Sequence, residues 1–476
     1  MSVATRPQLR RAIGRLGFFS LAFGSMIGVG WITALGTWFQ NAGPLGAIIA
    51  FVAGGLLMLI IGLCYAEVTA MLPVSGGEVA YAYKAFGTNK AFLVGWCLAF
   101  GYLTVSAFEA VSIGIVLSYI EPSLTVAPLY RVNGTTVYGS HLALALAFTT
   151  FITAINYIGV NVASQVQIVL TMLLVIFAAA FVISGIGGGS LDNLRPGFVA
   201  DSPLLILKGI LAVFVTVPFW FVGFDTIPQA AEERLSHLPA QRLSQCILAS
   251  IVGSVIFYIA VIVSAGMITP WQTIVDSELP TARAFETAFD SRFWANVVLS
   301  VGLIGLLTSW NGFFLAGTRV LFALGRAHII HPSFGSTHPK FGTPSTAVIF
   351  GGVVTFLSAC LGKGALIAFV DVGSLCIVLA FIGVAVSLVR LRKAFPDLQR
   401  PYRMPGGSVL PMVAIVGSVF MVLVMVVPGS PGALTGLEWV IFAGLSVAGV
   451  VFWVAARKTR AGLSEEERGK LILEDS

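Results

Sequence analysis

Two short stretches rich in glycine or proline interrupt apolar segments that would otherwise form continuous α-helices. The first is Gly24–Gly30, and the second is Phe219–Asp225, which Pro218 and Pro228 bracket. Glycine weakens a helix by about 1 kcal/mol per residue relative to alanine, and proline removes a helical hydrogen bond. In lipid, an opened backbone is tolerated only where it lines a protein or water cavity. The two stretches therefore predict two broken helices beside a cavity.

A pair of broken helices can bind a zwitterion without charged side chains. Exposed N–H groups of one half-helix can hold a carboxylate, and exposed carbonyl groups of the other can hold an ammonium. Close helix packing is the alternative, since Gly24 and Gly28 form a GxxxG pair. Breaks at matching places in two halves of a membrane protein favour a transport site.

Two carboxylates are expected near the middle of the membrane. Placing Asp225 there costs at least about 2.5 kcal/mol, which indicates a function. Glu109 follows Tyr102 and Ser106 on one helical face, and such a polar stripe should line a cavity. Three interpretations of Glu109 remain open. It contacts a cationic amino acid or amine, carries a proton, or makes a structural hydrogen bond to a neighbouring helix.

The elements that position these residues are membrane helices. Of the 476 residues, 57% are hydrophobic and only 10% are charged, and long apolar runs recur from end to end. This pattern predicts an all-α polytopic membrane protein of about twelve helices. The expected spans are 16–40, 44–71, 91–119, 140–158, 162–187, 203–231, 243–268, 293–325, 344–362, 365–389, 408–428 and 436–456.

The distribution of positive charge predicts the orientation. With a cytoplasmic N-terminus, 21 of the 27 lysine and arginine residues lie on the cytoplasmic side and 6 lie outside. Lysine and arginine collect on the cytoplasmic side of membrane proteins. We therefore expect a multi-pass protein of the inner or plasma membrane with both termini cytoplasmic. The basic residues border the lipid bilayer, which argues against nucleic acid as a partner.

Cysteine and histidine give no sign of a metal or cofactor. The five cysteines are scattered through apolar segments, and the five histidines lie at segment ends or in loops. Neither set has the spacing of metal ligands or of a disulfide framework. We expect no resident metal and no cofactor, and the sequence makes no prediction of an oligomeric state.

Four short motifs, in order over residues 20–345, resemble those of the amino acid–polyamine–organocation (APC) transporter superfamily. They are Met26-Ile27-Gly28-Val29-Gly30, Pro73-Val74-Ser75-Gly76-Gly77 with Tyr81, Gly223-Phe224-Asp225 with Ala230-Ala231-Glu232-Glu233, and Thr318-Arg319-Val320-Leu321 with Gly342-Thr343-Pro344. Glu232 and Glu233 could pair with Arg234 or Arg319 as an inner gate, although solvated helix ends are the favoured interpretation.

The resemblance implies one transporter domain over residues 1–476 with the LeuT-type fold and alternating access. Its first inverted repeat would cover about 16–187 and its second about 203–389, followed by two helices at 408–456, with tails at 1–15 and 457–476. Helices one and six would be broken around the substrate. Carried onto this chain, with Glu109 added, the substrate-binding candidates are Ser25, Met26, Ile27, Gly28, Val29, Gly30, Glu109, Phe219, Trp220, Val222, Gly223 and Asp225.

The coupling ion is a separate question. Some members of the superfamily carry a lysine in helix five in place of a sodium ion, but Met172 occupies the matching position here. Thr308 and Ser309 could bind sodium together with the carbonyl groups of Gly24 and Ile27. Proton coupling through Asp225 or Glu109 is favoured, because buried carboxylates can titrate near neutral pH.

The expected function is secondary active import of an amino acid or a small organic amine, with proton coupling favoured. The alternatives are a sodium-coupled symporter, an exchanger, and a ligand-binding sensor on the same fold. A membrane-embedded enzyme would need a motif such as HExxH or GxSxG, and the sequence contains neither. A channel would more often need subunit symmetry and a re-entrant filter.

Overall fold

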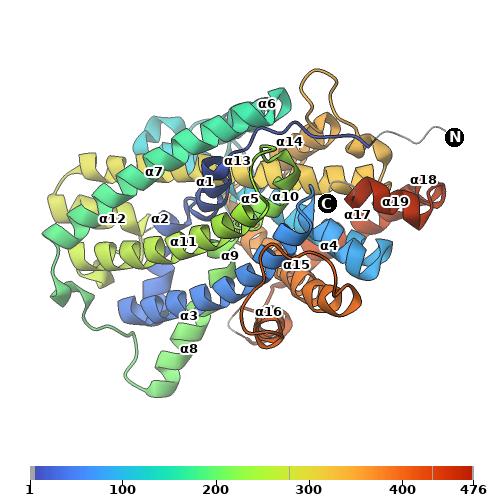
Figure 1. Cartoon of the computed structure of the whole chain (residues 1–476). Helices are drawn as coiled ribbons and strands as arrows, with labels where there is room; N and C mark the ends of the chain where they lie inside the picture. The colour runs from blue at the N-terminus through green and yellow to red at the C-terminus, as the bar shows by residue number, and fades with distance from the viewer. Residues whose placement is uncertain (1–5, 278, 431, 474–476) are drawn as a thin grey trace.

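The computed structural model describes residues 6–277, 279–430 and 432–473, and it consists almost entirely of helices (Figure 1). Eleven helical segments of this described part are long and apolar enough to cross a membrane. The ninth expected span, 344–362, forms a helix of only 15 residues and is not among the eleven. An all-α polytopic membrane protein, as predicted from the sequence, is therefore confirmed.

The helices follow one another in the order of the expected spans. Their bounds are α1 (Arg15–Met26), α2 (Gly30–Thr33), α3 (Leu35–Met71), α4 (Gly77–Phe86), α5 (Thr88–Ile120), α6 (Gly139–Ile158), α7 (Val160–Gly188), α8 (Pro203–Phe214), α9 (Val217–Phe221), α10 (Thr226–Gln229), α11 (Gln241–Ile268), α12 (Pro280–Phe289), α13 (Arg292–Arg326), α14 (Ser345–Ala359), α15 (Leu366–Ala394), α16 (Val409–Val426), α17 (Gly436–Ala455), α18 (Arg457–Ala461) and α19 (Glu465–Leu473). Two antiparallel strands, β1 (Pro128–Val132) and β2 (Thr135–Tyr138), form a hairpin between α5 and α6.

The first two expected spans meet at a kink inside α3. Gly43 has φ 72° and ψ 169°, and Pro44 follows it. A side chain at this position would collide with the carbonyl oxygen of Gly197, because an ideal Cβ would lie 2.5 Å from it. Glycine is the residue that tolerates this left-handed backbone without strain. The end of the first span and the start of the second therefore lie on either side of Gly43, as the sequence predicted.

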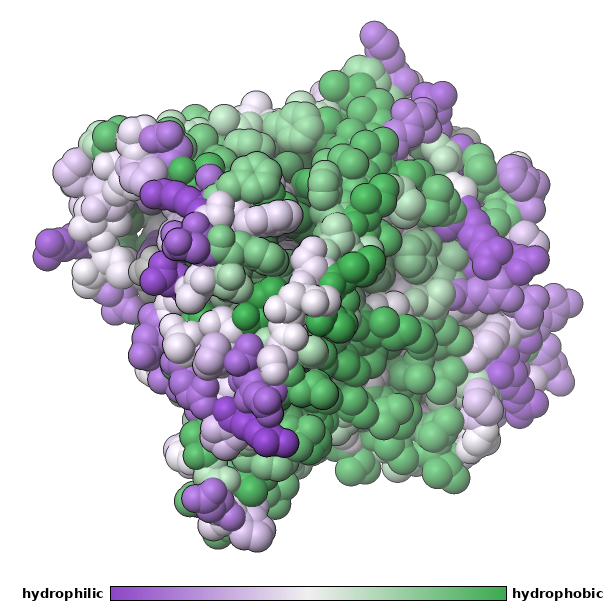
Figure 2. Space-filling view, turned by 90° about the vertical axis from the view of Figure 1, so that its left-hand side faces the viewer, coloured by the Kyte–Doolittle hydropathy of each residue, from purple (hydrophilic) through white to green (hydrophobic). Residues whose placement is uncertain are grey.

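In four cases a membrane span packs against the span that comes five spans later in the chain. They are α1 with α10, α3 with α11, α5 with α13, and α6 with α14. Around this core, large apolar side chains of α7, α16 and α17 face outward, and Val416 and Val440 are 63% and 68% exposed. Figure 2 shows hydrophobic residues in a broad band across one face, with hydrophilic residues on both sides of it. Such a band fits the hydrocarbon core of a bilayer.

The ends of α5 define two opposite faces of the molecule. Thr88, at the start of α5, contacts Glu465 of α19, and the β1–β2 hairpin follows the other end. The first and last described residues lie on the α19 side, because Arg6 Nε donates to the carbonyl oxygen of Leu471 at 3.1 Å; α19 is at the right in Figure 1. We call this side the tail face and the side that carries the hairpin and α12 the hairpin face.

On the tail face, Arg468 fastens α19 to the helices that cross the membrane. Its side chain is buried and donates to Ala327 O at 3.1 Å, Thr88 Oγ1 at 3.2 Å and Glu465 Oε1 at 2.7 Å. A buried guanidinium must have its donors satisfied, so these acceptors specify where α19 docks.

Replacing Arg468 by alanine should release α19. Hydrogen bonds to a charged group contribute about 1.5–3 kcal/mol each, so even one lost bond makes local opening more than about tenfold more frequent. Limited proteolysis should then cut within residues 457–473 faster than in the wild type. Lys470→Ala is the matched control, because Lys470 pairs with Glu466 at the surface. Equal cleavage of all three proteins would contradict the assigned role of Arg468.

Candidate functional site

The first expected break is present between α1 and α2. The helix ends at Met26, Ile27 has φ −106° and ψ 78°, and helical structure resumes at Gly30. The carbonyl oxygen of Met26 accepts a hydrogen bond from Tyr258 Oη of α11 at 2.9 Å. The opened backbone is therefore partly satisfied by a neighbouring helix, as a break inside a membrane requires.

The second break lies between α9 and α10 and touches the first. Gly223 has φ 133°, and an ideal Cβ on it would lie 2.8 Å from Met26 N and 2.9 Å from Ser25 Cβ. Both the left-handed backbone and the close approach require glycine here. The two interruptions thus meet at one point.

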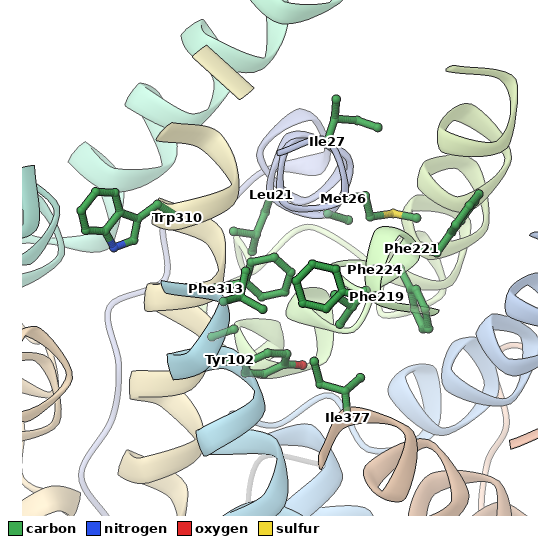
Figure 3. Close-up of a cluster of buried hydrophobic side chains, with 14 of the residues drawn as sticks. Leu21, Met26, Ile27, Tyr102, Phe219, Phe221, Phe224, Trp310, Phe313 and Ile377 are labelled. Carbon is green, nitrogen blue, oxygen red and sulfur yellow. The ribbon is translucent and has the colours of Figure 1, made fainter. Parts of the chain in front are cut away.

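A small cavity of about 20 Å³ lies at this crossing, which is room for about one water molecule. Its lining comes from α1, α2, α5, α9, α11, α13 and the first break. The lining residues are Ser25, Met26, Gly28, Gly30, Val105, Phe108, Glu109, Phe219, Trp220, Tyr258, Ser309 and Phe313. Figure 3 shows Met26, Phe219 and Phe313 grouped near the crossing of the two broken helices.

The structure brings most, but not all, of the expected site residues to the cavity. The expected residues that line it are Ser25, Met26, Gly28, Gly30, Glu109, Phe219, Trp220 and Ser309, whereas Ile27, Val29, Val222, Gly223 and Asp225 lie buried beside it. Sequence reasoning missed Val105, Phe108, Tyr258 and Phe313. The helical spacing of Val105 from Glu109 and of Phe313 from Ser309 could have indicated two of them. No sequence signal singles out Tyr258.

Trp220 closes one side of the cavity. Its ring lies against Gly30, where an ideal Cβ would come within 2.1 Å of the ring. Phe219 packs edge-on against Trp220 with 5.0 Å between ring centroids, and Trp220 Nε1 donates to Thr216 Oγ1 at 3.1 Å. A substrate larger than water requires this aromatic pair to move, so both rings are suitably placed to act as a gate.

Glu109 is the acidic residue among those that line the cavity. Its side chain is 2% exposed, and its Oε2 atom has no hydrogen-bond partner within the described chain. Ser309 is its hydrogen-bonding neighbour, and Oε1 lies against Gly28. A lone buried carboxylate is costly, so Glu109 must hold a proton or meet a cation when the cavity is closed.

Asp225 has a different environment, because its carboxylate is held by protein donors. Tyr102 Oη donates to Oδ2 and the Gly223 N–H donates to Oδ1, each at 2.8 Å. These bonds fasten the second break to α5. In this conformation Asp225 therefore supports the backbone around the site and does not line the cavity.

A second acid, Glu78 of α4, lies on the tail side of Asp225. Gln229 joins the two, since its amide donates to Glu78 Oε2 and, at 3.3 Å, to the carbonyl oxygen of Asp225. Burial, reinforced by the nearby Asp225 carboxylate, raises the pKa of Glu78 to about 8. Glu109, Asp225 and Glu78 thus follow one another in space from the cavity toward the tail face.

The residues considered for ion coupling do not form an open site. Thr308 Oγ1 donates to Gly305 O at 2.8 Å, and Ser309 faces Glu109. Gly24 faces Gln167 and Thr171 of α7. Met172 is half-buried and is not among the residues nearest to Gly24. The amide of Gln167 donates to Ser20 O and to Thr308 O, both at 3.1 Å. Gln167, which sequence reasoning missed, therefore joins α1 to α13.

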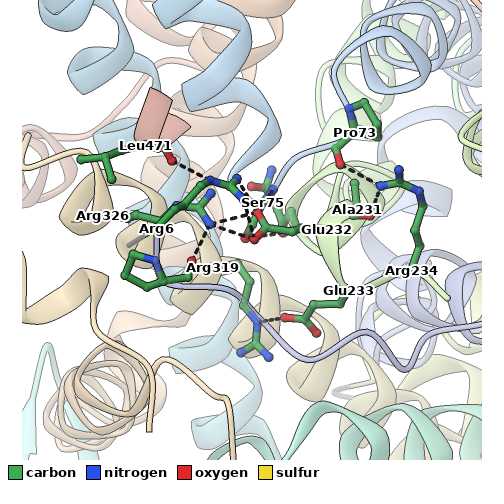
Figure 4. Close-up of polar contacts among 12 residues, drawn as sticks. Arg6, Pro73, Ser75, Ala231, Glu232, Glu233, Arg234, Arg319, Arg326 and Leu471 are labelled. Carbon is green, nitrogen blue, oxygen red and sulfur yellow. Dashed lines mark hydrogen bonds and ion pairs between the residues drawn. The ribbon is translucent and has the colours of Figure 1, made fainter. Parts of the chain in front are cut away.

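The chain between α10 and α11 carries a buried ion-pair cluster on the tail face. Arg326 and Arg6 bind Glu232 at 2.9 Å and 3.1 Å, and Arg319 binds Glu233 at 2.7 Å (Figure 4). Both glutamates are at most 2% exposed. The favoured expectation of solvated helix ends was therefore wrong, because the tail and α13 cover these side chains.

Burial opposes the charge of Glu232, but Arg326 and Arg6 outweigh it and hold the pKa of this carboxyl below its usual value. A carboxylate with a lowered folded pKa adds stability above its unfolded pKa, near 4.5, and loses it as the pH falls through the folded value. Glu232→Gln should thus destabilise the protein by about 3–5 kcal/mol at neutral pH.

Thermal unfolding in detergent between neutral pH and about pH 3, below the unfolded pKa, tests this expectation. The difference in unfolding temperature between the wild type and Glu232→Gln should become smaller as the pH falls. Glu286→Gln is the control, because its partner Arg283 is an exposed residue three positions away and such pairs contribute about 0–1 kcal/mol. A difference in unfolding temperature that stays constant with pH would show that Glu232 is not charged in the folded protein.

Comparison with known proteins places these observations in a family. A family model described as amino acid permease matches residues 13–453. The branched-chain amino acid permease BcaP of Bacillus subtilis is 29% identical over 425 residues, covering 87% of this chain and 88% of the relative. The methylthioribose transporter of the same organism is 27% identical over 466 residues, covering 94% of each chain. Cationic amino acid transporter 7, chloroplastic, of Arabidopsis thaliana is 26% identical over 454 residues, covering 93% of this chain and 75% of the relative.

The family match includes both broken helices, all four sequence motifs and nearly every membrane span. The relatives are permeases and transporters and not enzymes, in agreement with the sequence analysis. The protein therefore belongs to the amino acid permease family of the APC superfamily.

Proposed function

We propose that this permease imports an amino acid by alternating access, coupled to protons. The observation that carries the proposal is the closed cavity at the contact of two broken helices, with the carboxyl group of Glu109 facing into it. A small amine is the second substrate class that this carboxyl group would suit.

The backbone supports an amino acid as substrate. Helix termini leave N–H or carbonyl groups without intrahelical partners, and the start of α2 and the end of α9 both border the cavity. The α-carboxylate would bind at the first break and the ammonium at the carbonyl groups of the second. Aromatic residues such as Phe108, Phe219 and Phe313 would surround an apolar side chain. Relatives named for branched-chain and cationic amino acids fit this class.

Matching contacts at the two faces support alternating access and an inverted repeat over about 16–187 and 203–389. On the hairpin face, Thr281 Oγ1 at the start of α12 donates to Trp31 O of α2 at 2.8 Å. On the tail face, Ser75 Oγ just before α4 donates to Gln229 O of α10 at 3.0 Å. Both α4 and α12 have 10 residues, and each touches the outer part of the broken helix on its side. Releasing one contact at a time would open the cavity to one side.

Proton coupling is favoured over sodium coupling by the environments of the polar groups. Glu109 has an unpartnered oxygen, so protonation and substrate binding can both compensate its charge. A sodium ion between α1 and α13 would need carbonyl and hydroxyl oxygens, but the amide of Gln167 lies against Gly24 and donates to Ser20 O and Thr308 O.

The charge pattern supports the inner or plasma membrane, with the tail face in the cytoplasm. Arginines concentrate around α18, α19 and the segment after α15, which lie on the tail face or join spans there. Import would then run from the hairpin face to the tail face.

Transport by Glu109→Gln should separate the roles of this carboxyl group. In liposomes with an alkaline interior, the wild type should accumulate an amino acid from a panel of branched-chain, cationic and simple amine substrates. The variant should keep counterflow exchange and lose accumulation, because it has no titrating group in the cavity. Ser106→Ala is the matched control, since Ser106 lies on the same helical face but its hydroxyl donates within its own helix, to Tyr102 O.

Other results would redirect the assignment. Loss of binding confined to cationic substrates would make Glu109 a counter-ion. Exchange without net uptake in the wild type would indicate an exchanger. Ligand-induced thermal stabilisation without any transport would indicate a sensor.

Sodium should have no effect on the wild type. Initial uptake rates and unfolding temperatures should agree within about twofold and about 1 °C, respectively, when sodium is replaced by choline, because binding of an ion to the folded state would raise stability. Uptake driven by a sodium gradient would contradict the proton proposal.

Gln167→Ala should destabilise the protein by about 1–3 kcal/mol for each buried acceptor left without a donor.

A further inference from the structure

On the tail face, α4 packs against α10, which is the tail-side part of the second broken helix. Gln229 of α10 holds this contact with both its backbone and its side chain. Its carbonyl oxygen accepts hydrogen bonds from Ser75 Oγ at 3.0 Å and from the Gly76 N–H at 3.4 Å. Its side-chain amide donates to Glu78 Oε2. The tail face can open here only if α10 leaves α4, so Gln229 must then give up Glu78.

The polar atoms at this contact are one proton short. Glu78 and Gln229 are completely buried, and Glu78 Oε1 and Gln229 Oε1 have no hydrogen-bond partner within the described chain. A carboxylate oxygen and an amide oxygen can only accept hydrogen bonds. The hydroxyl group of Tyr65 faces Glu78 and can donate to one of these two acceptors. A proton on the carboxyl group of Glu78 would supply the second donor.

The charge of Asp225 also favours a proton on Glu78. Burial, together with this neighbouring carboxylate, raises the pKa of Glu78 to about 8. Asp225 itself accepts hydrogen bonds from Tyr102 Oη and from the Gly223 N–H, which stabilise its charged form. When two carboxyl groups lie close together in a buried place, one of them keeps a proton. The hydrogen bonds assign that proton to Glu78.

The other helices that pack against α4 bring no base to Glu78. The groups that face it are Asp225 of the second break, Gln229 of α10, Tyr65 of α3, Tyr102 of α5 and Tyr81 of α4 itself. Basic residues of α13, α15 and α19 are engaged elsewhere: Arg319 binds Glu233, Arg390 binds Ala85 O and Arg468 binds Glu465. A negative charge on Glu78 would therefore lack a cation to compensate it.

We propose that Glu78 is a positioning residue that, while protonated, holds the tail face closed through Gln229, and that gives its proton to water on the tail side when the face opens. The proposal rests on the alternating access of the proposed function, but it does not depend on proton coupling through Glu109. Opening would expose the carboxyl group to water, where a glutamate is ionised at neutral pH. The ionised form would in turn oppose the return of α10 to α4, because it restores two buried acceptors for one donor.

Transport should therefore become slower as the cytoplasm becomes more acidic. The pKa of Glu78 is about 8 in the closed form and returns toward its ordinary value of 4.5 in water, so closure takes up a proton. The closed face is favoured at low pH on the tail side and loses this preference as the pH rises through about 8. Between these two pKa values, the ratio of closed to open protein changes by up to about tenfold per pH unit.

Infrared spectroscopy of the purified protein tests the proton without any need for transport. A protonated carboxyl group has a carbonyl band that a carboxylate lacks. The wild type should lose a component of this band in alkali with a midpoint near pH 8, and Glu78→Gln should lack that component. Glu466→Gln is the control and should keep it, because Glu466 is an exposed acid of α19 that pairs with Lys470.

Tyr65→Phe provides a second variant that keeps the carboxyl group. It removes the nearby donor and should move the midpoint to higher pH, because a donor to the carboxylate lowers its pKa. Identical alkaline difference spectra of the wild type and Glu78→Gln would overturn the proposal. So would a midpoint that Tyr65→Phe leaves unchanged.

Leucine exchange in inside-out membrane vesicles tests the gate, because the medium then sets the pH on the tail face. With the luminal pH held constant, raising the pH of the medium from about 6 to about 8 should raise the exchange rate of the wild type about tenfold. Glu78→Gln stays neutral and should exchange leucine at the slow acid rate throughout. Glu78→Asp should restore the pH dependence, and Glu466→Gln should behave as the wild type does.

These results separate the gate from the coupling mechanism. Exchange by Glu78→Gln that depends on the pH of the medium as strongly as that of the wild type would overturn the role of Glu78. Exchange by the wild type that depends on pH in this way but never leads to proton-driven accumulation would refute coupling through Glu109 and leave the role of Glu78 intact.

Discussion

The contact between two opened backbones is the constraint on which the rest of the structure depends. Gly223 lies directly against Ser25 and Met26, so each break faces the other across a distance that a methyl group would fill. Backbone groups freed in a membrane must find partners in protein, and Tyr258 and Asp225 supply some of them. Residues of both broken helices border the cavity. The same cause thus explains the glycines, the close packing of α1 against α10 and the existence of a polar site in an apolar core.

Four of the buried carboxylates are held in three ways, and each fits a different task. Asp225 is fully supported by Tyr102 and Gly223 and stabilises a backbone break. Glu232 and Glu233 are neutralised by arginines and close the tail face. Glu109 keeps an unpartnered oxygen beside the cavity. Since an uncompensated buried charge is the most costly of these states, and Glu109 lines the cavity, a proton or a substrate that arrives there would compensate its charge.

The two faces of the protein are closed by different chemistry. Arginine–glutamate pairs and the docked helix α19 cover the tail face, where Arg6 binds both Glu232 and the carbonyl oxygen of Leu471 in α19. On the hairpin face, an aromatic pair, a single Thr281–Trp31 hydrogen bond and an anchored hairpin take this role. Buried ion pairs are sensitive to the loss of one partner, whereas rings can swing aside without leaving a charge uncompensated.

The sequence by itself determined the membrane class, the order of the helices, the two breaks and the family, because apolar runs, glycines and prolines act locally on the chain. It also indicated eight of the residues that line the cavity, six of them on the broken helices, with Glu109 and Ser309 singled out as polar groups in apolar spans. Only the tertiary structure decided that Asp225 supports the backbone, that Gln167 faces α1 in place of Met172, and that Glu232 and Glu233 are buried. These outcomes depend on partners more than 80 residues away in the chain, such as Tyr102, Ser20 and Arg319. Local pattern carries no information about such contacts, because they arise only when the helices pack.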